Sequence, residues 1–270
     1  MEGICALCSK ATILKDSHFM PKSVYRVIAN SFPDEGKDLV FISGSTKSAA
    51  YTSKQAKKHL LCEKCESLFS KHGEDAVLPL IYRPNGFKLA TKIRKFKTLA
   101  TVKDEKWCFP LNDIFAKSFM YFAVSIAWRS SCTEWEAFGM PKTKGNIRTE
   151  TMRSFKNYLL GMTSTPSNTF LAVYVHNQNV KFPSMGFPTI KNHEGYQHIV
   201  FELPGVKFSL ISGHDISTNI YDTYSVNNSK VYFISRDLSS HPDFNYVVNF
   251  MKHESIPRGR LAKELGGKNV

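Results

Sequence analysis

Four of the six cysteines in this 270-residue chain form two Cys-x-x-Cys pairs. Cys5 and Cys8 make the first pair, and Cys62 and Cys65 make the second. This spacing lets both thiolates of a pair turn toward one ion, so two pairs complete a tetrahedral shell of four sulfurs. Soft thiolate ligands in that geometry select zinc, and a closed shell makes the site structural rather than catalytic. The sequence therefore predicts a structural zinc site.

The cysteine spacing is also compatible with two alternatives. Two unrelated pairs of buried cysteines would show the same pattern, and a thioredoxin-like redox role would need only one pair. The first residues, MEGICALC, lack the basic and apolar regions of a secretion signal, so we expect a cytoplasmic, reducing environment. Paired Cys-x-x-Cys motifs are more often metal sites than disulfides there. Cys108 and Cys132 stand alone among apolar residues and are interpreted as core residues.

The chain carries 36 lysines and arginines against 23 aspartates and glutamates, a net charge of +13. Such a surplus favours a polyanionic partner, most often nucleic acid, through phosphate contacts. The alternative is a basic surface without a binding role. Residues 87–106 hold a dense basic run, which is either a phosphate-binding surface or the solvated face of an ordinary element. The candidate nucleic-acid contacts in this run are Lys88, Lys92, Arg94, Lys95 and Lys97.

The elements that must position these residues follow from the periodicity of the sequence. Residues 21–32 have the apolar spacing of a helix, 39–43 are typical of a strand, and the polar residues 43–58 are typical of a loop. Residues 112–132 are apolar on nearly every side, as in a helix buried in a core, and their most apolar part is too short to cross a membrane. We expect a frayed or partner-bound tail from residue 256 onward. A second helix is predicted at 147–160. Four strands with a two-residue period are predicted at 170–177, 198–205, 206–213 and 230–237.

These elements predict an α+β fold with two parts. Residues 1–82 contain both cysteine pairs and form a zinc-bearing N-terminal module. Residues 83–270 form a larger body that carries the basic segment, the buried helices and an antiparallel sheet.

Two stretches together resemble the HNH endonuclease family in its four-cysteine, zinc-bearing form. They are CALCSKATILKDSHFMPK, from Cys5, and LLCEKCESLFSKHGED, which contains the second cysteine pair. The shared pattern is a Cys-x-x-Cys pair, His18 followed three residues later by Pro21, then the second pair and a polar residue, Glu66, that opens a helix. Ser17 before His18 and the segment WRSS at 128–131 resemble a bacterial subset that is associated with anti-phage defence.

The resemblance implies a ββα-metal fold for the N-terminal module. In that fold His18 acts as the general base, drawing a proton from the water that attacks the scissile phosphate, and an imidazole is well matched to this role at neutral pH. A divalent cation, Mg²⁺ or Mn²⁺, neutralises charge on the phosphate. Glu66 stands where the family has its final histidine or asparagine, and a carboxylate is a suitable hard ligand for such a cation. Glu74 is a second candidate ligand.

Besides Glu66, two positions depart from the family pattern. Ser17 replaces the acidic residue that often precedes the histidine, and Gln55 or His59 stands where the middle asparagine is expected. On a regular helix Glu66, Ser70 and Glu74 share one side, although two turns separate the two carboxylates.

Two functions follow from the pattern and its departures. The first is a metal-dependent HNH-type endonuclease that hydrolyses phosphodiester bonds as a defence effector, with DNA as the expected substrate and RNA as the alternative. The alternative is a catalytically degenerate, zinc-stabilised module that binds nucleic acid or docks a partner. In both cases the body beyond residue 82 is expected to hold substrate or a protein partner, such as an ATPase or sensor.

Overall fold

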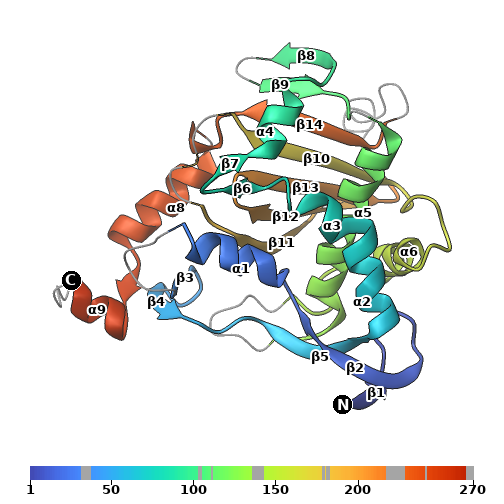
Figure 1. Ribbon diagram of the computed structural model, residues 1–270, viewed down its shortest axis with the longest axis horizontal. Helices are drawn as coiled ribbons and strands as arrows, with labels where there is room; N and C mark the ends of the chain where they lie inside the picture. The colour runs from blue at the N-terminus through green and yellow to red at the C-terminus, as the bar shows by residue number, and fades with distance from the viewer. Residues whose placement is uncertain are drawn as a thin grey trace.

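The computed structural model describes residues 1–31, 38–102, 105–110, 112–135, 143–177, 180, 183–216, 229–240 and 242–265. Over these ranges, none of the helices combines the length and the apolar character that crossing a membrane requires. A seven-stranded sheet dominates the fold in Figure 1, with the order β11-β12-β13-β10-β14-β9-β8. Its strands are β8 (Thr98–Val102), β9 (Glu105–Cys108), β10 (Thr169–His176), β11 (Gly186–Asn192), β12 (Tyr196–Leu203), β13 (Val206–Gly213) and β14 (Val231–Arg236). Neighbouring strands are antiparallel, except that β10 and β14 are parallel.

The long helix α5 (Asp113–Cys132) packs against one face of this sheet. The side chain of Asn112 caps its first turn by accepting the N–H of Phe115 at 2.8 Å. Alternate residues of the strands face α5, as the two-residue period of a strand requires. Phe208 and Phe233 of the sheet, for example, contact Phe119 of the helix with ring centroids 6.2 and 4.9 Å apart.

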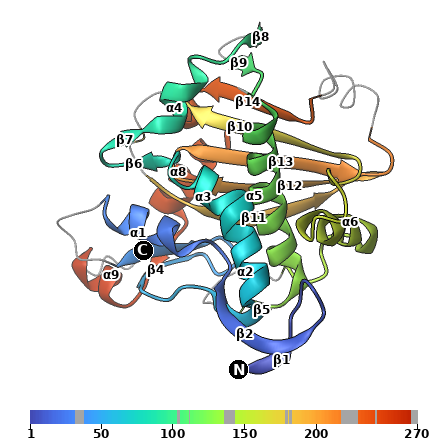
Figure 2. The same cartoon turned by 45° about the vertical axis from the view of Figure 1, so that its right-hand side comes forward.

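A second layer of helices covers the other side of α5, which explains why α5 is apolar all round (Figure 2). This layer contains α6 (Thr149–Leu159) and a continuous helical segment made of α2 (Glu63–Phe69), the π-helical turn η1 (Ser70–Glu74) and α3 (Asp75–Val77). Gly73 is buried where η1 meets α5, and a Cβ atom at this position would lie 3.0 Å from the Cα atom of Phe122. The absence of a side chain at Gly73 therefore permits the close approach of the two helices.

The N-terminal part of the chain contains a three-stranded sheet in the order β1-β2-β5. Strands β1 (Glu2–Ile4) and β2 (Ala11–His18) form a hairpin, and β5 (Lys57–Cys62) pairs with β2 and leads directly into α2. The chain between β2 and β5 forms α1 (Lys22–Ala29), β3 (Leu39–Ser43) and β4 (Ser48–Thr52). One continuous apolar core includes residues of this sheet, of α2, of α5 and of the seven-stranded sheet.

The last described elements run from the large sheet back to the N-terminal part. Helix α8 (Pro242–His253) follows the short 3-10 turn η3 (Leu238–Ser240), and β15 (Ile256–Pro257) then pairs in parallel with β4. Helix α9 (Arg260–Glu264) lies beside β4, where Arg260 bonds Asp38 at 2.8 Å and the Tyr51 hydroxyl donates to Glu264 at 2.7 Å. The remaining elements are the hairpin of β6 (Tyr82–Arg83) and β7 (Gly86–Phe87), followed by α4 (Lys88–Ile93).

The mixed α+β class and the large, mostly antiparallel sheet are confirmed. The predicted helices correspond to α1, α5 and α6, and the predicted strands correspond to β3, β10, β12, β13 and β14. The expectation of a loop at 43–58 was wrong, because β4 lies inside it and β5 begins in it. Residues 256–264 are not frayed, since they are bound to the β3–β4 hairpin, whereas 266–270 lie outside the described residues. The boundary at residue 82 stays a prediction.

Candidate metal centre and neighbouring histidine site

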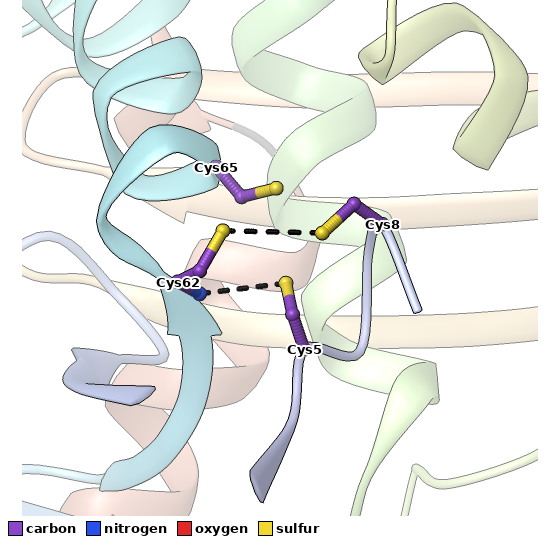
Figure 3. A group of neighbouring side chains, drawn as sticks. All are labelled: Cys5, Cys8, Cys62 and Cys65. Atoms are coloured by element: carbon purple, nitrogen blue, oxygen red, sulfur yellow. Dashed lines mark hydrogen bonds between the residues drawn. The ribbon is translucent and has the colours of Figure 1, made fainter. Parts of the chain in front are cut away.

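Cys5, Cys8, Cys62 and Cys65 come together at one point of the N-terminal part (Figure 3). The first two lie in the connection between β1 and β2, Cys62 is the last residue of β5, and Cys65 is in the first turn of α2. Their sulfur atoms all lie within 4.8 Å of one another, and the Sγ atoms of Cys8 and Cys62 are 3.9 Å apart. The cluster therefore joins the β1–β2 hairpin to the helix that follows β5.

The geometry and chemistry of the cluster fit a metal ion. A tetrahedral zinc–thiolate site places its sulfurs about 3.8 Å apart, since each Zn–S bond is about 2.3 Å long. All four residues are free cysteines, and the backbone N–H of Cys62 donates to the Sγ atom of Cys5 at 3.4 Å. Burial raises the pKa of Cys8 and Cys65, whereas at Cys5 hydrogen bonds from backbone N–H groups outweigh burial and lower the pKa to about 7. The cluster can hold a metal ion such as zinc.

His18 is the last residue of β2 and lies opposite Lys57 of β5. Partial burial lowers its pKa, and the positive charges of Lys22 and Lys57 lower it further. The Asp16 carboxylate and a hydrogen bond with the Gln55 side chain act in the opposite direction. The net lowering of the pKa favours the neutral imidazole at pH 7, the form that can accept a proton.

Gln55, one of the two residues considered in place of the family's middle asparagine, thus contacts His18. The other, His59, is exposed and lies opposite Asp16 in the β2–β5 pairing.

Ser17 connects β2 to α2. Its side chain is buried, and its hydroxyl donates to the Oε1 atom of Glu66. The same hydroxyl oxygen accepts the backbone N–H of Leu61 at 3.2 Å. Residues 17 and 66 are therefore neighbours across the strand and the helix, although 49 positions separate them in the sequence.

Glu66 and Glu74 both line one open hollow on the surface, together with Ser70. The expectation that these three residues share a side is consistent with this hollow. Glu74 also forms a salt bridge with Arg129 of α5, with the Nη2 and Oε1 atoms 2.5 Å apart. Glu74 is thus paired with a cation of the protein, and its role as a metal ligand stays a prediction. The ring of His72 packs on Tyr121 with centroids 5.3 Å apart.

Arg129 is the residue that sequence reasoning noticed only as part of WRSS and did not connect to the site. Its guanidinium contacts the carbonyl oxygens of His18 and Phe19 as well as Glu74. A charged residue directly after the long uncharged stretch 118–128 of this helix is the signal that could have pointed to it.

The five basic residues between Lys88 and Lys97 are all exposed. Leu89 and Ile93 are the buried residues of α4, and they leave its basic side chains in solvent. In both Figure 1 and Figure 2, α4 and β1–β2 lie at opposite ends of the molecule. The structure therefore does not bring the basic segment close to the β2–α2 site, and its role in binding nucleic acid stays a prediction.

Comparisons with models of protein families, with curated proteins and with solved structures found no match for this chain.

Proposed function

We propose that this chain is a metal-dependent HNH-type endonuclease that hydrolyses phosphodiester bonds in DNA and serves in anti-phage defence. The observation that supports this proposal is the contact between Glu66 and Ser17, the residue that precedes His18 in the chain. In the family pattern these positions carry the metal ligands and the general base. Here the β2–β5 pairing and α2 bring Ser17 and Glu66 together, and the cysteine cluster joins the β1–β2 connection to β5 and α2.

His18 would supply the proton acceptor. The neutral imidazole takes a proton from a water molecule, whose oxygen then attacks the phosphorus atom, and the bond between phosphorus and the leaving oxygen breaks. The lowered pKa of His18 suits this role, because most of the imidazole is already neutral at pH 7.

The hollow offers carboxylates, the ligands that a hard divalent cation such as Mg²⁺ or Mn²⁺ prefers, next to Lys15, which pairs with Glu63 at 3.5 Å. Glu66 is the first candidate ligand. A hydrogen bond from Ser17 to its Oε1 atom is compatible with cation binding, since one carboxylate oxygen suffices for a ligand. When bound, the cation would neutralise charge on the phosphate and on the leaving oxygen.

A second candidate function is a zinc-stabilised module that binds nucleic acid or a partner without cutting. The observation that favours it is the neutral hydroxyl of Ser17, which stands where the family often has a carboxylate and is already bonded to Glu66 and Leu61. Fewer charged ligands weaken the binding of a divalent cation. In this case the body would hold the partner, such as an ATPase or sensor protein.

Nicking of supercoiled plasmid DNA with Mg²⁺ or Mn²⁺ separates the two functions. We expect the native chain to cut the plasmid. The cutting rate of His18→Ala should be lower by about 10²- to 10⁴-fold because the general base is removed, whereas His253→Ala should cut at the native rate. His253 is a matched control because it is exposed at the end of α8.

DNA binding without cutting in either cation would favour the binding module. Equal cutting by His18→Ala and the native chain would show that His18 is not the base. A parallel assay on single-stranded RNA decides the substrate class.

A further inference from the structure

We infer that Arg129 of α5 is a positioning residue that holds the backbone at His18, so that the body of the protein completes the candidate site. The catalytic consequence of this inference rests on the proposed function, but the positioning itself does not. The Nη1 atom of Arg129 donates to the carbonyl oxygen of His18 at 2.9 Å and to that of Phe19 at 3.3 Å. Its Nη2 atom bonds Glu74 at 2.5 Å.

The segment that Arg129 contacts is the point where the chain leaves the β2–β5 sheet. β2 ends at His18, and α1 begins at Lys22. The N–H of Phe19 still donates to the carbonyl of Ala56 at 2.9 Å, but the carbonyl oxygens of residues 18 and 19 point to the guanidinium. Arg129 therefore replaces the strand partner at this turn, and it fixes the backbone from which the His18 imidazole projects.

The surroundings hold the guanidinium in one orientation. Arg129 is 3% exposed, and its guanidinium carbon lies 4.8 Å from the centroid of the Phe69 ring. The indole N–H of Trp135 donates to the carbonyl of Arg129 at 2.8 Å, and the Trp135 ring stacks on Phe19 at 5.0 Å. Trp135 thus connects the backbone of Arg129 to the segment that Arg129 binds, and Phe69 packs against the guanidinium.

Burial of this charge is costly, which argues that it has a specific role. A buried ion pair stabilises a fold no better than apolar residues of similar size would in many proteins. The Nε atom of Arg129 has no hydrogen-bond partner among the described residues, so one N–H donor of the buried guanidinium is left without an acceptor. The planar guanidinium can reach two carbonyls and a carboxylate at once, which a lysine cannot do in the same geometry. The contacts therefore point to positioning rather than to stability.

The test uses the full-length, zinc-loaded protein and the variants Arg129→Met, Arg129→Lys and Glu74→Gln. The matched control is Arg148→Met, because Arg148 also donates to a backbone carbonyl, that of His193 at 2.7 Å, but at the start of α6. The first readout is the NMR titration of the His18 ring in histidine-labelled protein, assigned with His18→Gln. The second is kcat and KM for plasmid nicking, and zinc content serves as the check on folding.

We expect the Arg129 variants to keep their zinc, to shift and broaden the His18 ring signals, and to leave the other histidines unchanged. Nicking should show kcat lowered by about 10²-fold with KM nearly unchanged, since a small misplacement of a catalytic group acts mainly on the chemical step. Glu74→Gln should act in the same direction but less strongly, because it removes the counter-ion and keeps an oxygen acceptor. Arg148→Met should leave the His18 signals and nicking as they are in the native chain, because the carbonyl that Arg148 bonds is that of His193.

If Arg129→Met fails to fold, Arg129→Lys and Glu74→Gln decide the question. Unchanged His18 signals in those two folded variants would overturn the inference. A native chain that does not cut DNA but whose His18 signals respond to the Arg129 variants would refute the proposed function and support the positioning role.

Discussion

Replacement of Gly73 by alanine probes the seam between the N-terminal module and α5. A Cβ atom at this position would lie 3.0 Å from the Cα atom of Phe122 and 3.2 Å from both its Cβ and its N atoms. Carbon atoms in favourable contact are about 3.5–4.0 Å apart, so the two helices must separate by roughly 0.5 Å. Two of the three nearest atoms belong to the backbone of α5, which cannot rotate away as a flexible side chain would.

Two opposing effects set the magnitude. Overpacking of this kind costs about 1–3 kcal/mol, and replacing a glycine inside a helix by alanine returns about 1 kcal/mol. Because the close approach is to backbone atoms, we expect a net decrease of about 1–2 kcal/mol in the free energy of unfolding. For a chain of this size that corresponds to a fall in Tm of about 2–8 °C.

Calorimetry of zinc-saturated protein measures this effect, and Gly44→Ala is the control. A Cβ atom at Gly44 meets no atom within 4 Å, so the control should stay within about 0.5 kcal/mol of the native chain. If Gly73→Ala melts at or above the native Tm, the close approach of η1 and α5 is not required. The same shift in both variants would mean that glycine replacement, rather than the packing against α5, is responsible.

Three further predictions concern the metal, the histidine and the basic segment. Cys62→Ser should lose its zinc and unfold the N-terminal module, because metal binding contributes to folding. Elemental analysis measures the zinc content, and the control Cys132→Ser should keep its zinc. Zinc retained in Cys62→Ser would contradict the site. Cutting of DNA should decline as pH falls below about 6.5, the ordinary pKa of histidine, because the pKa of His18 lies below this value and protonation removes the base. Lys22→Met removes a neighbouring positive charge that lowers the His18 pKa, so it should move this decline to higher pH. The same lowered pKa makes native His18 favour the neutral form, so its contribution to stability is present above pH 6.5 and is lost as pH falls through the folded pKa. Reversal of charge at Lys92, Arg94, Lys95 and Lys97 should reduce the log–log salt slope of DNA binding by about one unit for each phosphate that is no longer bound, and an unchanged slope would identify the segment as solvated surface.

Local patterns in the sequence determined several parts of this protein. The Cys-x-x-Cys spacing predicted the four-cysteine cluster, because two thiolates three positions apart can face one point whatever the surrounding fold. The apolar character of residues 112–132 predicted the buried helix α5, and the two-residue period predicted strands such as β12. The geometry within each cysteine pair, the helix and the strands depend on neighbours a few residues away, whereas the meeting of the two cysteine pairs spans 54 positions of the chain. The strand β4 was missed because its residues, SAAYT, have little apolar alternation, and its pairing with β3 and β15 decides its conformation.

The tertiary structure alone decided which distant residues share the candidate site. Ser17 and Glu66, and Arg129 and His18, are brought together across 49 and 111 positions of the chain. It also placed the basic segment of α4 at the opposite end of the molecule from β1–β2, although only a few turns of helix and a hairpin separate that segment from α2 in the sequence. Sequence periodicity reports which face of an element is buried, but it does not specify the element against which that face packs. The packing of α5 between the large sheet and the α2–η1–α3 segment settles which elements meet, and it places Arg129 against the backbone of His18.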